Sequence, residues 1–240
     1  MAVSSIINRQ MVNVGDSTSS IARVVGVVES SMTLNVPSDF STLQEAMNWI
    51  EARILLDTVT IKIADGTYNT GQHTIRHNNY LMVDIIGNTS NPSNVTFNSS
   101  GGSGFYIEGC PLKSLQGVKV VCSSGIGIYV NRGGQIHELN YVEITGCGGI
   151  AGLMVHDRCF VKGTSINTHN NTGYGVANAM MSTVNISYTT SSNNQWGFFG
   201  VNGSQGRLLG STTTTGNSAG NYSPGLNQFS TSDGSFWINS

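Results

Sequence analysis

The side chains best suited to chemistry in this chain of 240 residues stand together at His156, Asp157 and Arg158. Asn131 and Arg132 occupy the matching place 25 residues earlier. Stacked at one corner, a carboxylate, an imidazole and two guanidinium groups would bind an acidic sugar. They would also suit a polysaccharide lyase, which needs a base close to a group that binds a carboxylate. The alternative is a solvated turn whose local ion pairs contribute less than ~1 kcal/mol.

A glycosidase needs more, because two carboxylates must flank the bond that it cleaves. Carboxylates are scarce in the repeat region described below, which holds four before Asp233: Glu108, Glu138, Glu143 and Asp157. Glu143 alternates with apolar neighbours and is expected to face solvent. This scarcity favours binding or a structural role over hydrolysis, so we assign no catalytic residue. If the chain is an enzyme, the candidates are Asp157, His156, Arg158 and Arg132.

The composition narrows the class of protein that positions these side chains. Charged residues make up 10 % of the chain, against roughly 25 % in an average domain. Gly, Ser, Thr and Asn together make up about 45 %, which excludes helical bundles and doubly wound α/β folds and indicates short strands with tight turns. The net charge of −2 gives no excess of positive charge of the kind that binds nucleic acid. No signal peptide and no apolar run of membrane-spanning length is found, so membrane insertion is not expected.

The four cysteines, Cys110, Cys122, Cys147 and Cys159, form no Cys-x-x-Cys pair. They predict no zinc site, and we expect no metal and no cofactor. The cysteines are expected to be small buried hydrophobes in a reducing compartment.

A repeat orders the chain. Four-residue blocks that begin with glycine recur every 22–25 residues, at Gly104, Gly127, Gly152, Gly175 and Gly197. Two apolar ladders keep the same period: Ile136, Val161, Val184 and Val118, Val142, Ile166. Such a unit is a coil of three short strands that buries its apolar face only by stacking on its neighbours. The sequence therefore predicts an all-β parallel solenoid.

One helix precedes the repeats. Ser41 and Gln44 fit a capping box, and apolar residues at helical spacing follow as far as Ile54, so a helix is expected at about 42–54. It would close the open end of the stack. Residues 1–36 lack the repeat and are expected to be a separate attachment segment. The solenoid domain would span 37–240, with regular coils at about 59–210 and a C-terminal cap at 211–240.

Strand parity predicts an outward stripe of mainly apolar residues along the stacked coils. The second and fourth residues of each block should point inward and the third outward, which gives Tyr106, Tyr129, Met154, Ala177 and Phe199. An exposed apolar stripe indicates a trimer interface or a face on which sugar rings stack. The opposite parity, which would bury the stripe, remains an alternative. Further candidates for glycan binding are Trp196, Phe199, Tyr174 and Asn131, and Trp237 is a weaker one.

Three segments resemble the pectin-lyase-like family of right-handed parallel β-helices: Val36–Met47, Val59–Tyr68 and Ile85–Asn88. Within that family the chain is most similar to tail fibres and tailspikes of bacteriophages, over roughly residues 36–210. The resemblance implies a right-handed parallel β-helix with an N-terminal capping α-helix. It also implies a homotrimer whose N-terminal segment, residues 1–36, attaches to other virion proteins.

These observations lead us to expect a virion protein that recognises host surface polysaccharide. The first alternative is a polysaccharide depolymerase, either a lyase or a glycosidase, with the same fold. The second is a virion decoration or connector protein that binds no ligand. Between Gly163 and Ser240 the only charged side chains are Arg207 and Asp233, so partner chains or neutral sugar are expected to cover this third.

Overall fold

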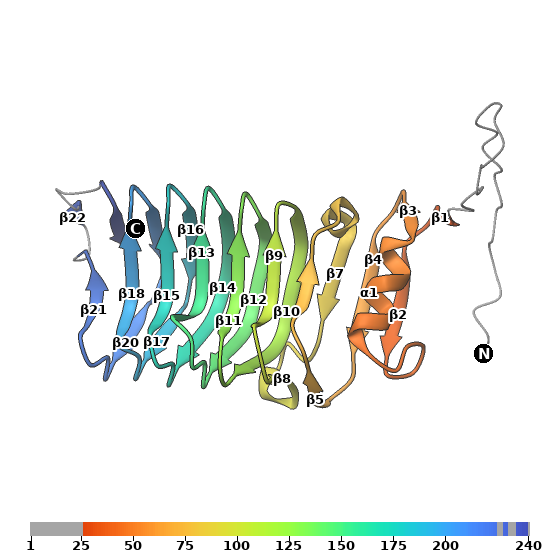
Figure 1. Cartoon of the computed structure of the whole chain (residues 1–240), viewed down its shortest axis with the longest axis horizontal. Helices are drawn as coiled ribbons and strands as arrows, with labels where there is room; N and C mark the ends of the chain where they lie inside the picture. The colour runs from red at the N-terminus through yellow and green to blue at the C-terminus, as the bar shows by residue number, and fades with distance from the viewer. Residues whose placement is uncertain (1–25, 225–227, 230–233, 240) are drawn as a thin grey trace.

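The chain winds into a parallel β-solenoid of about eight turns with one α-helix, as the sequence predicts (Figure 1). The structure is a computed structural model, and it describes residues 26–224, 228–229 and 234–239. Residues 1–25, the larger part of the expected attachment segment, lie outside the described residues. In Figure 1 the coils stack from the helix at the right toward the blue strands at the left.

One wall of the solenoid is a parallel sheet of seven strands, each contributed by a different coil. The glycine-led blocks of the sequence form its central strands. In spatial order from the helix end, the strands are β6 (His73–Ile75), β9 (Ser103–Glu108), β11 (Ile126–Asn131), β13 (Ala151–His156), β15 (Tyr174–Ala179), β18 (Trp196–Val201) and β21 (Gly220–Ser223).

The rest of each coil belongs to a 14-stranded sheet. Its main path is β2 (Met32–Val36), β4 (Val59–Ile63), β7 (Val83–Ile86), β10 (Pro111–Cys122), β12 (Gln135–Thr145), β14 (Phe160–His169), β16 (Thr183–Ser187), β19 (Gln205–Leu209), β23 (Phe236–Asn239) and β22 (Gln228–Phe229). A side branch holds β5 (Gly66–Thr70), β8 (Val95–Ser99), β17 (Thr190–Ser192) and β20 (Thr213–Thr215). Residues with positive φ divide the long strands β10, β12 and β14 into two halves: Gly117, Tyr141 and Ser165.

The interior confirms both apolar ladders. Ile136 pairs with Val161, and Val161 with Val184. Val118 pairs with Val142, and Val142 with Ile166. All six residues are buried. Since equivalent residues of successive coils lie in register, the period in the sequence is the period of the stack.

The helix α1 (Leu43–Glu51) is shorter than expected. Its N-cap is Thr42, whose hydroxyl accepts from the Glu45 backbone N–H at 3.2 Å, while the Glu45 carboxylate accepts from the Ser41 N–H at 2.9 Å. The N-cap therefore lies one residue later than predicted, and Glu45 in place of Gln44 bonds back to the backbone, at the N–H just before the cap. Residues Arg53–Leu55 form β3, which pairs with β1 (Gly26–Val28) and ends the helix early.

The buried face of α1 (Leu43, Ala46, Met47 and Ile50) joins the solenoid core. Beneath it β2 pairs in parallel with β4, and Leu34 and Val36 are buried. The solenoid therefore begins before residue 37. Two 3₁₀ helices lie between the strands: η1 (Asn78–Met82), in which Leu81 is 51 % exposed, and η2 (Pro92–Asn94).

The coils also continue past residue 210, through β20 and β21. The last strand, β23, pairs with β19 and places Trp237 in the core, fully buried against Phe198 at 5.2 Å between ring centroids. The indole fills the space above Gly206, where a Cβ atom would lie 2.0 Å from the ring. Trp237 therefore closes the C-terminal end of the core, and the suggestion that it stacks on sugar is wrong.

The corner that precedes the seven-stranded sheet changes along the solenoid. Its equivalent residues in successive coils are Cys122, Cys147, Asn171, Asn194 and Asn217. Each asparagine Oδ1 accepts the backbone N–H of the equivalent residue one coil earlier, at 3.0–3.1 Å. Each Nδ2 group donates to a carbonyl oxygen, that of Ile144, Thr168 or Ser191. We call these three residues the asparagine ladder.

Candidate functional site

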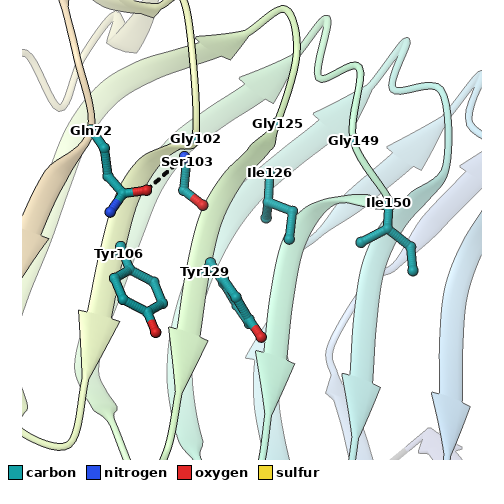
Figure 2. Close-up of a pocket in the computed structure, with 9 residues that line it drawn as sticks. All are labelled: Gln72, Gly102, Ser103, Tyr106, Gly125, Ile126, Tyr129, Gly149 and Ile150. Carbon is teal, nitrogen blue, oxygen red and sulfur yellow. Dashed lines mark hydrogen bonds between the residues drawn. The ribbon is translucent and has the colours of Figure 1, made fainter.

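An open groove of about 420 Å³ crosses the outer face of the seven-stranded sheet (Figure 2). It is lined by Gln72, Gly102, Ser103, Tyr106, Gly125, Ile126, Tyr129, Gly149 and Ile150. Tyr106 and Tyr129 are partners in register on β9 and β11, with ring centroids 5.3 Å apart and planes inclined by 45°. Both rings are half-buried and lie on the surface of the sheet. The groove therefore presents two adjacent aromatic platforms.

The glycine before each inward pair aims these rings outward. A Cβ atom at Gly127 would lie 2.4 Å from Cγ2 of Ile144 and 2.9 Å from Sγ of Cys147, both inside the core. Since glycine leaves this space free, the backbone turns two successive residues, Gly127 and Ile128, inward. The residues on either side, Ile126 and Tyr129, then face the groove. Counting alternate residues from Gly127 correctly predicts that Tyr129 faces outward. It does not predict that Ile126, the residue before the glycine, faces the groove as well.

The rim of the groove adds polar groups that the sequence analysis missed. The Gln72 side chain accepts from the Ser103 backbone N–H at 2.9 Å, as Figure 2 shows. Gln72 precedes β6, one coil before Ser103, and only its place in the stack brings it to the groove. No sequence signal marks it, because that coil lacks the glycine-led block.

A polar network lies next to the groove, around the hydroxyl of Tyr106, whose ring points toward the ends of the strands (Figure 2). The Tyr106 hydroxyl accepts from Asn131 Nδ2 at 3.2 Å, and Glu108 is bonded to Tyr106, Arg76 and Arg132. Burial alone would raise the pKa of Glu108, but the hydrogen bonds from these three partners outweigh it and hold the pKa below its usual range. Glu108 is thus a carboxylate that positions two arginines.

The predicted corner is only partly assembled. Asn131 and His156 are partners in register, with Oδ1 and Nδ1 3.3 Å apart. Asp157 pairs with its own neighbour Arg158 at 3.2 Å, whereas Arg132 pairs with Glu108. The corner therefore separates into two ion-pair groups, one around Glu108 and one at Asp157. The sequence analysis names Glu108 only as a carboxylate of the repeat region and gives no role to Arg76, although both belong to this network.

The aromatic stripe is outward as predicted, except at one position. Tyr106, Tyr129, Met154 and Phe199 are half-buried on the outer face, whereas Ala177 is buried. Ala177 lies in register between Met154 and Phe199, whose longer side chains flank its methyl group.

A second aromatic group lies on the same sheet nearer the C-terminus. Tyr174 and Phe199 stack with centroids 4.2 Å apart and nearly parallel planes, and Trp196 pairs in register with Tyr174. We call these three residues the C-terminal aromatic cluster. Three strand spacings of ~4.8 Å separate its Phe199 from Tyr129. Asn131, the remaining candidate for glycan binding, lies in the polar network beside Tyr106 and not in this cluster.

Glu143, expected to be a simple exposed residue, is the centre of a polar cluster on the other sheet. Its carboxylate contacts Lys119 Nζ and His169 Nε2, each at 3.0 Å, and accepts from Ser93. Burial would raise the pKa of Glu143, but bonds from Ser93, Lys119 and His169 lower it. The cluster ties η2, β10, β12 and β14 together.

Within the described part of the chain, no three His, Cys, Asp or Glu side chains are grouped so as to hold a metal ion. No helix of those residues is long and apolar enough to cross a membrane. The chain matches no protein-family model, no curated protein and no solved structure with which it was compared. What the geometry defines is a class: a parallel β-solenoid with an aromatic outer face.

Proposed function

We propose that the chain is a saccharide-binding subunit of a bacteriophage fibre or spike, and that the groove of the seven-stranded sheet is its binding site. The observation that supports this is the pair of half-exposed rings, Tyr106 and Tyr129, in a groove with a polar rim. Sugar rings stack their apolar faces on aromatic rings while their hydroxyls need hydrogen-bonding groups at the edge. Equivalent platforms one strand apart suit a ligand that is itself a repeating chain.

The virion part of the proposal rests on the resemblance of the opening motifs to phage tailspikes. Those motifs form β2, α1, β4 and β7 here, at one end of the solenoid. Attachment would use the segment before them. The ligand would be a host surface polysaccharide, and the protein would act on the virion.

A second role, contact between copies in a homotrimer, is favoured by the C-terminal aromatic cluster. Tyr174, Trp196 and Phe199 present apolar surface in a third of the chain where Arg207 and Asp233 are the only charged residues. Apolar surface without a rim of charge is typical of an interface between subunits. Tyr174 lies one strand beyond Ile150 at the edge of the groove. Copies that meet at this cluster would leave the tyrosine platforms, Tyr129 two strands away and Tyr106 three, open to a ligand.

The binding test uses an array of capsular polysaccharides and lipopolysaccharides probed with the full chain. Tyr106→Ala and Tyr129→Ala should each weaken binding at least about tenfold, as expected for a buried aromatic contact. Tyr188→Ala is the matched control, because Tyr188 is an exposed tyrosine outside the seven-stranded sheet. Unchanged binding in Tyr129→Ala would contradict the proposed site. Saccharide release that is lost in Asp157→Ala would instead establish the depolymerase.

The oligomer test is the mass in solution of the chain and of the double variant Tyr174→Ser with Phe199→Ser. A trimer that dissociates in the variant is the expected result. A monomeric wild-type chain would remove the second role and leave the binding proposal standing.

A further inference from the structure

We propose that the saccharide bound in the groove is acidic: a sugar ring stacks on Tyr106 and Tyr129, and its carboxylate is bound by Arg76 and Arg132. This inference rests on the proposed function and specifies the class of ligand. It follows from the charge, the positions and the exposure of the groups at the polar end of the groove.

Charge gathers at that end. On the seven-stranded sheet and the turns that follow its strands, the charged residues in the described part of the chain are Arg76, Glu108, Arg132, Asp157 and Arg158. Three guanidinium groups face two carboxylates, which leaves one net positive charge on a chain whose formal charge is −2. One carboxylate on a ligand would balance this excess.

Glu108 orients the two arginines and leaves some of their N–H donors available to a ligand. Both bond to the same carboxylate, that of Glu108, whose own side chain is only 12 % exposed. The Arg76 guanidinium also lies over the Tyr106 ring, 5.5 Å from its centroid. Their side chains remain 61 % and 70 % exposed. A guanidinium has five N–H donors, so each retains donors for a ligand in an orientation that Glu108 has already fixed.

The spacing fits a ligand that bridges platform and arginines. Glu108 and Asn131 each stand two residues beyond a platform tyrosine, and a strand rises ~3.3 Å per residue. Glu108, which holds both guanidinium groups, and Asn131 therefore lie ~7 Å along the strands from the backbone of the tyrosines. They lie on the side to which the hydroxyls point (Figure 2), and the Arg76 guanidinium reaches back to 5.5 Å from the Tyr106 ring centroid. A sugar that carries a carboxylate on its ring spans this interval, and the planar fork of arginine matches that group. A neutral sugar would offer no second carboxylate to the N–H donors that Glu108 leaves free.

The test is calorimetric titration of the full chain with trigalacturonic acid and with 3′-sialyllactose, each beside its carboxyl-reduced neutral derivative. At least one acidic probe should bind about tenfold tighter than its reduced form in dilute buffer. The difference should shrink in about 0.5 M salt, where exposed charges are screened. In the variant with Arg76→Gln and Arg132→Gln, the affinity for the acid should fall to that of the reduced form. Arg207→Gln, on β19 of the other sheet, is the matched control and should keep the preference.

The outcomes separate the two proposals. If acid and reduced forms bind equally and Tyr129→Ala weakens both, the acidic ligand is overturned while saccharide binding stands. If the preference for the acid persists in the double arginine variant, the assignment to Arg76 and Arg132 is overturned. If no probe binds the wild-type chain, both proposals fail.

Discussion

The corners before the seven-stranded sheet are built from thiols in one half of the solenoid and from amides in the other. Cys122 and Cys147 make only weak contacts, from Sγ to carbonyl oxygens at 3.4 and 3.7 Å. The asparagine ladder instead bonds each coil to the previous one through both amide atoms. At the corner after the sheet a hydroxyl follows a thiol, since the Ser182 hydroxyl accepts the Cys159 N–H of the previous coil at 3.0 Å.

The change follows the chemistry of the interior. In the N-terminal half the core is aliphatic and aromatic, and rings of Phe97, His73 and Phe105 pack at 5.2–5.4 Å. In the C-terminal half hydroxyls enter the core, where Thr168 bonds Ser191 at 3.0 Å and Asn194 reaches Ser191 at 3.1 Å. One backbone coil is thus stabilised in two ways, by close packing or by buried hydrogen bonds. A buried polar corner is favourable only where every group has a partner.

The largest expected effect is that of Asn194→Ala. The change leaves the Asn171 N–H and the Thr168 carbonyl group without their partners, and each unsatisfied buried group costs ~1–3 kcal/mol, so stability should fall by about 4 kcal/mol. Denaturant unfolding measures it. Asn185→Ala, on the outer face of β16, is the control and should change stability by less than ~0.5 kcal/mol. Equal losses in the two variants would contradict the ladder.

The second largest effect is the loss of stability at low pH that is expected from His73, which lies in the apolar half of the core. Burial lowers the pKa of its imidazole from 6.5 to about 4, and neither ring nitrogen has a partner among the described residues. The folded state therefore favours neutral His73. Its contribution is fully present above pH 6.5 and is lost as the pH falls toward 4, by about 3 kcal/mol.

The measurement is the free energy of unfolding between pH 7 and pH 4 for the wild-type chain and for His73→Leu. Carboxylates contribute to both profiles equally, so the difference between the profiles isolates the histidine. Parallel profiles would show that His73 is solvated or paired, and the contrast between the two interiors would weaken.

The smallest effect is expected at the corner that Cys122 and Cys147 form before the seven-stranded sheet. Cys147→Ser should cost about 1 kcal/mol, because no strong hydrogen bond is lost. Burial raises the pKa of the Cys147 thiol to about 12 and those of Cys110 and Cys159 to about 11. These three thiols should resist alkylation at pH 8 until the chain unfolds, which mass spectrometry would record. Rapid labelling of the folded chain, or a loss as large as for Asn194→Ala, would contradict the distinction.

The fold was predictable because its determinants recur. The ladder from Val118 to Ile166 keeps its period through two coils, and the inward pair Ile128 and Val130 follows from strand parity. The groove was predictable in part. Tyr106 and Tyr129 were placed on the outer face, but Gln72 comes from a coil without the repeat motif, and its position depends on how the chain crosses between strands.

The corner around Asp157 shows what the repeat in the sequence cannot predict. Register places Asn131 beside His156, and the sequence predicts this pair. The carboxylate that pairs with Arg132 depends instead on the direction of the side chains at the turn. Both turn residues have positive φ, 51° at Arg132 and 64° at Asp157. Alternation of residues does not encode that direction. The asparagine ladder escapes the sequence for a related reason, since the many asparagines of this chain indicate turns and nothing in their spacing marks a buried bonding group.

The one-coil register has a consequence for how such a molecule changes in evolution. The groove and the C-terminal aromatic cluster lie on one sheet, separated by a whole number of strands. Gain or loss of a single coil of 22–25 residues would move them apart or together by one step of ~4.8 Å and leave every wall intact. The distance between two surface features of the solenoid can therefore change in evolution only in whole steps of one strand spacing.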